Sequence, residues 1–358
     1  MTASSLALVA TVRGLDGSFL TWLYHHYQHG FRRIYLVFDA PDEDRETIDA
    51  IRSSAELAGA VLCIENDARH QERVRSLPQY GILEAGYERT VVHRQMLNVG
   101  AVMHHAIEEG IGWLLHLDSD ELLAPYSPGV PIARYFEQVP ERTDEVIFPN
   151  FEALPESEQI GDPFLETTLF KKSPYYMRYR EFELLYTAWN GHSGTFKLFN
   201  AYITGKSALR MRDANVPFVP ASVHHFLPIR FNKNVHIEDA GGPIVLHYPH
   251  CGLNRFVQRF TGFNRDRVNT YDGRGFTEDL YRQAAELVLE GREHELPSLY
   301  RRLVMLDDPR LRTRLHDQGF LLRRSPPHEG AQGRLLPAPS FEKDPAPAAP
   351  SHRTTRSA

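Results

Sequence analysis

Three acidic side chains stand together directly after a short apolar run. Asp118 and Asp120 are two positions apart and Glu121 follows them, while residues 113–117 read Trp-Leu-Leu-His-Leu. Side chains two apart in an extended segment project to one face, so both aspartates can reach the same small volume. Two carboxylates this close repel each other unless a cation neutralises them. A hard divalent metal, Mn²⁺ or Mg²⁺, would do so and would also bind a diphosphate.

The same cluster has a simpler explanation, in which Asp118 and Asp120 cap a following helix or lie on a solvated turn. An isolated Asp-x-Asp is common by chance. Here an apolar strand precedes the motif and the apolar pair Leu122-Leu123 follows it. Because ligands of open α/β sheets bind outside the carboxyl ends of the strands, this context favours the metal site.

The elements that must position these side chains alternate between apolar strands and helical patterns. Strands are predicted at residues 6–12, 34–38, 60–64, 113–117, 146–149, 169–171 and 244–248, and helices at 19–27, 46–57, 93–109, 253–260 and 277–289. This alternation favours an α/β fold with a parallel sheet and helices on its faces. Residues 66–89 predict a loop with some helix, and residues 175–205 a loop-rich binding cleft.

Composition limits the class of protein. The chain has 358 residues, of which 42% are hydrophobic, a net charge of −6 with mixed signs, and two cysteines. These values predict a folded core, no disulfide framework and no general nucleic-acid binding. No run reaches the roughly 20 apolar residues of a spanning helix, so we expect no integral membrane segment and a cytoplasmic protein, with peripheral membrane association left open.

Three regions follow from composition along the chain. We expect an α/β domain over residues 1–275, a helical C-terminal extension over 276–324 and a disordered tail over 325–358. The extension starts at a capping pattern, Thr277-Glu278-Asp279, and the tail is rich in Pro, Ala and Ser.

The acidic block also resembles a known family. Residues 95–98 (Gln-Met-Leu-Asn) and 113–123 (Trp-Leu-Leu-His-Leu-Asp-Ser-Asp-Glu-Leu-Leu) resemble a block of the family-2-like and family-92-like (DUF23-related) glycosyltransferases, with their D-x-D-E motif. Residues 12–31 resemble the opening of that group, and the later series Gly-Lys-Ser, His-His and His-Tyr at 205–207, 224–225 and 247–248 resembles its downstream order. The resemblance covers about residues 6–260.

This resemblance implies a GT-A-like fold and a metal-dependent glycosyltransferase. Such an enzyme moves a sugar from a nucleotide-sugar donor, here expected to be UDP-linked, to a hydroxyl of a glycan or other acceptor. It implies that Asp118 meets the donor ribose or the metal and that Asp120 coordinates the metal, with Mn²⁺ or Mg²⁺ bridging the donor diphosphate, and that Glu121 is catalytic or orients the loop. Arg13 and Asp39, at the ends of the first two strands, are candidates for the nucleoside.

Further candidates each have a structural alternative. Gln95 and Asn98 lie one helical turn apart and face the donor cleft or form an exposed polar face. Lys206 holds a phosphate as a point charge or is an ordinary turn lysine. His247 completes the metal shell or is a buried structural histidine, with His224 as a weaker rival.

The catalytic base is not resolved by the sequence. An inverting transferase needs a carboxylate within hydrogen-bond reach of the acceptor hydroxyl. Glu152, Glu156, Glu181 and Glu183 all follow the acidic motif and are left as alternatives.

Two other functions remain open. A metal-dependent nucleotidyltransferase or phosphohydrolase would use the same carboxylates, but it would normally add a glycine-rich phosphate loop or a denser cluster of acids and histidines. A non-catalytic carbohydrate-binding relative would retain the fold alone, and the intact Asp118/Asp120 pair argues against it.

Overall fold

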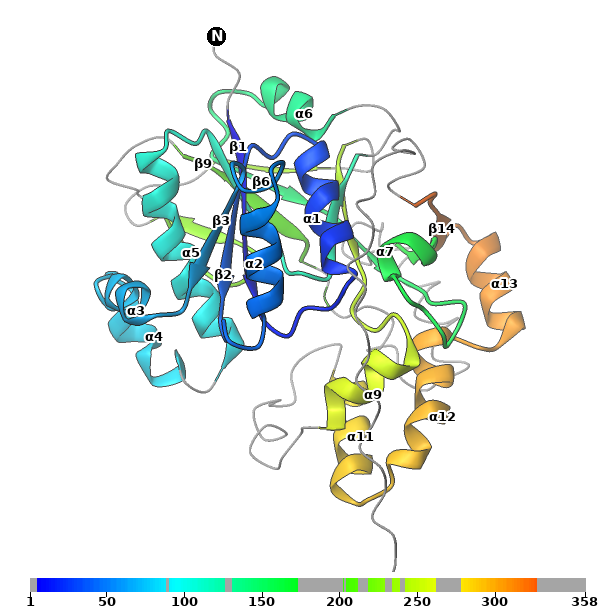
Figure 1. Cartoon of the computed structure of the whole chain (residues 1–358). Helices are drawn as coiled ribbons and strands as arrows, with labels where there is room; N and C mark the ends of the chain where they lie inside the picture. The colour runs from blue at the N-terminus through cyan, green and yellow to red at the C-terminus, as the bar shows by residue number, and fades with distance from the viewer. Residues whose placement is uncertain are drawn as a thin grey trace, which may run out of the picture.

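The computed structural model describes residues 5–87, 90–125, 131–172, 202, 204–211, 218–228, 234–238, 242–261 and 278–326. These residues form an α/β fold, as predicted (Figure 1). Its larger sheet contains, in spatial order, β12 (Val235–Ile237), β6 (Glu145–Phe148), β9 (Lys206–Arg210), β4 (Trp113–His116), β1 (Leu6–Val12), β2 (Arg33–Phe38) and β3 (Val61–Glu65). Strands β4, β1, β2 and β3 are parallel, whereas β9 runs antiparallel to both β4 and β6.

A second sheet of five strands adjoins the first. Its order is β14 (Leu321–Arg323), β8 (Leu169–Lys171), β7 (Asn150–Ala153), β13 (Ile244–His247) and β5 (Glu121–Ala124). A two-stranded ribbon pairs β10 (Phe218–Pro220) with β11 (Phe226–Pro228). Because β4 belongs to the first sheet and β5 to the second, the segment 117–120 links the two sheets.

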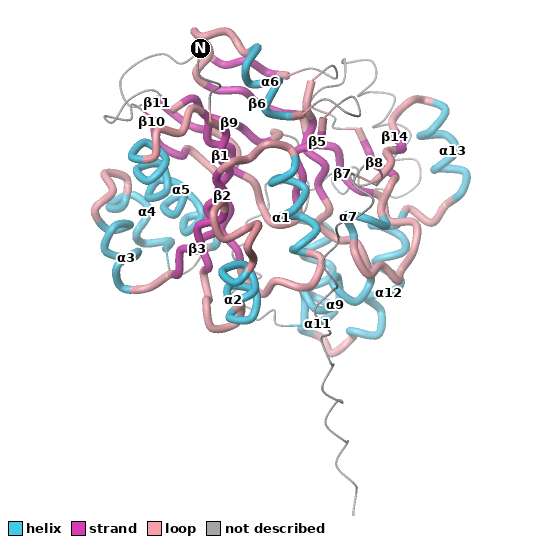
Figure 2. Tube along the Cα trace, turned by 45° about the horizontal axis from the view of Figure 1, so that its top comes forward, coloured by secondary structure: helices cyan, strands magenta, loops and turns pink. Residues whose placement is uncertain are grey.

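Helices cover both faces of the larger sheet. Across the whole fold, the described helices are α1 (Phe19–Gln28), α2 (Arg45–Ser53), α3 (Ala68–Arg75), α4 (Tyr80–Tyr87), α5 (Val91–Glu108), α6 (Ile132–Gln138), α7 (Pro163–Glu166), α9 (Leu253–Thr261), α11 (Glu278–Leu289), α12 (Leu296–Tyr300) and α13 (Pro309–Asp317). A 3-10 turn at Glu293–Glu295 and a π-helical turn at Arg301–Met305 accompany them. Figures 1 and 2 show α1 and α2 on one side of β1 to β3 and α5 on the other. None of the described helices is long and apolar enough to cross a membrane.

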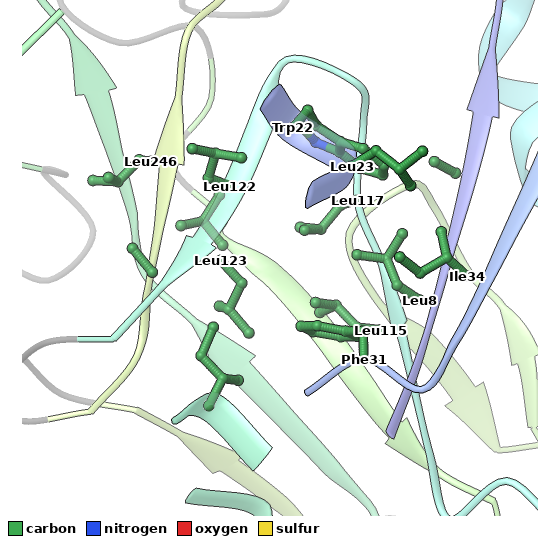
Figure 3. Close-up of a cluster of buried hydrophobic side chains, with 14 of the residues drawn as sticks. Leu8, Trp22, Leu23, Phe31, Ile34, Leu115, Leu117, Leu122, Leu123 and Leu246 are labelled. Carbon is green, nitrogen blue, oxygen red and sulfur yellow. The ribbon is translucent and has the colours of Figure 1, made fainter. Parts of the chain in front are cut away.

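The main core lies between the two sheets and α1. Leu117 of the β4–β5 link lies beside Trp22 of α1, and Leu8, Leu115 and Leu246 belong to the same buried cluster (Figure 3). A separate cluster on the opposite face of the first sheet packs α5 against β1 and β2. The alternation of the β1 side chains between these two clusters explains why its sequence is continuously apolar.

The C-terminal helices build a third core against the second sheet. Leu280 and Leu315, from α11 and α13, are buried in one cluster with Phe256 of α9 and Leu154, which follows β7. Strand β14 then pairs with β8. The predicted extension 276–324 is therefore joined to the rest of the chain by both packing and backbone hydrogen bonds, and residues 327–358 of the predicted tail lie outside the described residues.

Several short strands differ from the prediction, including β10, β11, β12 and β14. The pair Leu122-Leu123 lies in β5, and β7 and β9 were not predicted at all. Between 66 and 89 the described residues contain helices α3 and α4 rather than a long loop. Most of the predicted loop-rich cleft at 175–205 lies outside the described residues.

Candidate functional site

The acidic motif occupies the turn between β4 and β5. The amide of Glu121 donates to the carbonyl of Asp118 at 3.1 Å, and the amide of Tyr248 donates to the carbonyl of Asp120 at 2.8 Å. A strand follows the turn, so neither aspartate caps a helix, and the capping part of the simpler explanation is wrong. The turn lies at the carboxyl end of β4, beside the ends of β1 and β2, where Arg13 and Asp39 follow.

Three side chains of helix α1 contact the backbone of strand β5. The indole Nε1 of Trp22 donates to the Glu121 carbonyl at 2.6 Å. The ring of His25 contacts the Leu123 carbonyl through Nε2 at 2.8 Å, and Nε2 of His26 accepts from the Leu123 amide at 3.3 Å. All three side chains are buried, so the His25-His26 pair fixes the strand that carries Glu121.

Asp118 is held by a buried lysine and an amide. Lys206 Nζ lies 2.6 Å from one carboxylate oxygen, and Gln95 Nε2 donates to the other at 2.5 Å. The Lys206 ammonium also donates to the Val223 carbonyl at 3.1 Å and is 0% exposed. Burial acts to raise the pKa of Asp118, but the charge of Lys206 overcomes it and holds this pKa below its usual range. Both oxygens of Asp118 therefore already have strong donors.

Glu121 completes the surroundings of Lys206. Its Oε2 accepts from the Asp118 amide at 2.9 Å and lies 3.3 Å from Lys206 Nζ, and its Oε1 accepts from the Tyr202 hydroxyl at 2.5 Å. Glu121 is 0% exposed, and burial raises its pKa to about 7 although Lys206 acts in the opposite direction. Glu121 thus contacts the backbone of the acidic turn at Asp118.

The raised pKa of Glu121 predicts a pH-dependent stability in metal-free protein. Its folded value, about 7, exceeds the ordinary 4.5, so its contribution is fully present below pH 4.5 and is lost as the pH rises through 7. Glu121→Gln removes this dependence. We expect the free energy of unfolding of the variant, relative to wild type, to rise by about 3 kcal/mol between pH 4.5 and 8.

Urea unfolding with EDTA across that pH range measures the difference. The exposed Glu290→Gln, whose side chain is 55% exposed, is the matched control and should show no such rise. A difference between Glu121→Gln and wild type that stays constant with pH would contradict the prediction.

Asp120 faces His247 across a short gap. His247 Nε2 lies 3.7 Å from Asp120 Oδ2, and its Nδ1 lies 2.9 Å from Glu152 Oε2. The Asp120 side chain is 36% exposed, whereas His247 is buried. Burial acts to lower the pKa of His247, but Glu152 and Asp120 raise it well above its ordinary value. Burial likewise opposes ionisation of Asp120, yet His247 and Arg259 hold its pKa below the usual range.

A divalent cation fits Asp120 and His247 better than the predicted set of three ligands. In the described part of the chain, no cluster of three or more His, Cys, Asp or Glu side chains has an arrangement that could hold a metal. Asp118 is engaged by Lys206 and Gln95, so two of the predicted ligands, Asp120 and His247, remain as candidates. Their 3.7 Å separation is close to the roughly 3 to 3.5 Å between two ligands of one ion. Mg²⁺ commonly takes its other oxygens from water and a bound phosphate.

The remaining donor candidates lie around this turn. Asp39 accepts from Arg94 Nε at 3.0 Å, and Arg13 forms an exposed ion pair with Glu43. Asn98 donates to Thr11 Oγ1 at 3.1 Å, and its Oδ1 lies 2.9 Å from His70 Nε2.

The burial of Gln95 and Asn98 and the position of Lys206 decide between the alternatives that the sequence left open for these residues. Gln95 and Asn98 are 9% and 2% exposed, so the exposed polar face is wrong for both, although only Gln95 reaches the acidic turn. Lys206 lies in strand β9 rather than in a turn, and its buried ammonium is occupied by carboxylates.

The structure describes two of the four candidate bases. Glu152 is 2% exposed and contacts His247. Glu156 forms a two-pronged ion pair with Arg323 of β14, at 2.8 and 3.1 Å. Glu181 and Glu183 lie outside the described residues.

Tyr202 is a described site residue that the sequence did not single out. Its hydroxyl donates to Glu121, and its ring lies 4.6 Å from the ring of His224 and 4.8 Å from that of His247. No spacing rule marks it, because it stands outside any strand. His224, the rival metal ligand, has Nδ1 2.8 Å from the Gly205 carbonyl, and burial lowers its pKa to about 3.

Comparison with known proteins supports a glycosyltransferase. No protein-family model matches the chain. It is 26% identical over 334 residues to Glycosyltransferase-like At2g41451 of Arabidopsis thaliana, covering 88% of this chain and 68% of that protein. It is 25% identical over 330 residues to Glycosyltransferase-like At3g57200 of the same plant, covering 88% of this chain and 60% of that protein. The chain is thus homologous to glycosyltransferase-like proteins and spans about two thirds or less of their length.

Among solved structures, apo UDP-glucose pyrophosphorylase overlaps 83% of this chain and 99% of its own, at 7% identity and a TM-score of 0.21. So low a score carries no argument about fold or function.

Proposed function

We propose that this protein is a metal-dependent glycosyltransferase of the GT-A fold. It moves a sugar from a nucleotide-sugar donor, UDP-linked by expectation, to a hydroxyl of a glycan or other acceptor. The observation that carries this proposal is the partly exposed Asp120 carboxylate beside His247 Nε2 at the carboxyl end of β4. The two glycosyltransferase-like relatives favour it over the other metal-dependent reactions.

Asp120 and His247 would hold Mn²⁺ or Mg²⁺. When bound there, the ion neutralises negative charge on the departing nucleoside diphosphate. Asp120 is suited to this because its side chain is accessible and the neighbouring positive charges keep it ionised. His247 presents Nε2 because Glu152 occupies Nδ1.

Asp118 would bind the donor differently. Lys206 and Gln95 fix its carboxylate, which is 27% exposed, in one orientation at the end of β4. A fixed carboxylate accepts hydrogen bonds from a ribose or sugar hydroxyl without reorganisation, and such preorganisation favours binding. Asp39 and Arg13 would lie towards the nucleoside, because β2 and β1 end at the same edge as β4.

A panel of nucleotide sugars tests the function without knowledge of the acceptor. We expect slow hydrolysis of one donor, with release of free sugar and nucleoside diphosphate, that requires added Mn²⁺ or Mg²⁺ and stops with EDTA. Release of nucleoside monophosphate and sugar phosphate would instead indicate a phosphohydrolase. Absence of turnover and of metal-dependent nucleoside diphosphate binding, measured by calorimetry, would refute the transferase.

A further inference from the structure

Four charged or ionisable residues form a row across the second sheet. His247 of β13 stands opposite Glu121 of β5 on one side and opposite Glu152 of β7 on the other, and Glu152 stands opposite Lys171 of β8. Residues directly opposite on neighbouring strands have adjacent side chains on one face. Acids and bases therefore alternate along the row.

Every member of this row is buried. The exposed fractions are 0% for Glu121, 6% for His247, 2% for Glu152 and 5% for Lys171. Four buried ionisable groups in a small sheet would be strongly destabilising without mutual compensation. Here each acid lies between or beside bases, which supplies that compensation.

Glu152 determines which nitrogen of His247 faces Asp120. Its Oε2 lies 2.9 Å from Nδ1, so Nδ1 carries the proton and donates to this carboxylate. Nε2 is then the nitrogen 3.7 Å from Asp120 Oδ2. A histidine ligates a metal through the ring nitrogen that carries no proton, and the hydrogen bond made by the other nitrogen sets ring orientation and basicity.

We propose that Glu152, supported by Lys171, is a positioning residue that fixes His247 with Nε2 directed at the cation held by Asp120. In this role Glu152 orients a metal ligand and is not the base that deprotonates the acceptor hydroxyl. Lys171 stands opposite Glu152 on the neighbouring strand β8, on the other side of Glu152 from His247. The inference rests on the proposed metal-dependent function and extends it to two residues that touch neither donor nor acceptor.

Metal affinity measures this role directly. Glu152→Gln removes the negative charge and is expected to weaken Mn²⁺ binding in the presence of UDP by about 10- to 100-fold, the usual effect of losing such a partner. Electron paramagnetic resonance of free Mn²⁺ gives the affinity. Glu156→Gln is the matched control, because that carboxylate pairs with Arg323 at the surface, and its affinity should equal that of wild type. Lys171→Met should weaken binding in the same direction.

Nitrogen NMR supplies a readout that needs no variant. In wild type bound to Mg²⁺ and UDP, the His247 ring should carry its proton on Nδ1 and none on Nε2. A proton on Nε2, or Mn²⁺ affinity unchanged in Glu152→Gln, would overturn the positioning role. Failure of wild type to bind Mn²⁺ with UDP would instead refute the proposed function itself, so the two failures are distinguishable.

Discussion

Asp120→Asn should reduce donor hydrolysis by about 10³-fold and remove the dependence of UDP binding on Mn²⁺. Asparagine keeps the size of the side chain but supplies a neutral oxygen in place of a carboxylate. Stabilisation of a leaving group by a metal is worth several kcal/mol, and about 4 kcal/mol corresponds to this change in rate. The backbone contact with Tyr248 uses the Asp120 carbonyl, so the variant retains the turn.

Calorimetry of UDP binding, with and without Mn²⁺, separates this effect from unfolding. Wild type should bind UDP more tightly with the metal, and Asp120→Asn should bind equally with or without it. Asp317→Asn, an exposed aspartate at the end of α13 with a 71% exposed side chain, should behave as wild type. Metal-dependent binding that survives in Asp120→Asn would mean that the cation is held elsewhere.

The sequence predicts where the site lies better than it predicts which side chains contact one another there. Continuous apolar runs such as residues 6–12 predict buried parallel strands, and the rule for carboxyl ends then brings Asp118 and Asp39 to one edge. Both the α/β fold and the placement of the acidic turn follow from local pattern. The GT-A assignment and the domain boundaries at 275 and 324 stay predictions.

The missed strands show where local pattern is insufficient. Strand β7 reads Asn-Phe-Glu-Ala and β9 reads Lys-Ser-Ala-Leu-Arg, and both contain charged residues that are buried in the structure. A charged residue in a short segment favours the prediction of a loop, because strand propensity depends on what the side chain packs against. Lys206 and Asp118 are 88 positions apart, so their pairing is a property of the folded sheets.

Loss of that pairing produces the second large effect that we expect. Lys206→Met should destabilise the protein by about 3–5 kcal/mol at pH 8, because without the ammonium Asp118 would keep an uncompensated charge and Glu121 would take up a proton that the unfolded chain does not bind at this pH. Methionine approximates the length of the lysine stem, so the change in packing is small. The Lys206 side chain is 0% exposed, which leaves no route for solvent to replace the ammonium.

The pH dependence distinguishes loss of charge from loss of packing. In wild type, the pKa of Lys206 is raised by Asp118 and Glu121 against the lowering effect of burial. Its contribution is therefore fully present below its ordinary 10.5 and is lost only as the pH rises through the raised folded value. Wild type should show no loss from this group between pH 5 and 8. In Lys206→Met the two carboxylates take up protons more readily, so the deficit should shrink as the pH falls towards 5.

A double variant tests whether Lys206 and Glu121 are coupled. Adding Glu121→Gln to Lys206→Met removes one of the two acids that lose their counter-ion, so the double variant should be more stable at pH 8 than Lys206→Met alone, and the two changes should be strongly non-additive. Urea unfolding of wild type, both single variants and the double variant gives the coupling energy. A packing defect would instead leave the Lys206→Met deficit constant with pH and additive with Glu121→Gln. That outcome would remove Lys206 as the counter-ion of the acidic turn, and with it the reason why Asp118 stays ionised beside Asp120 before any metal binds.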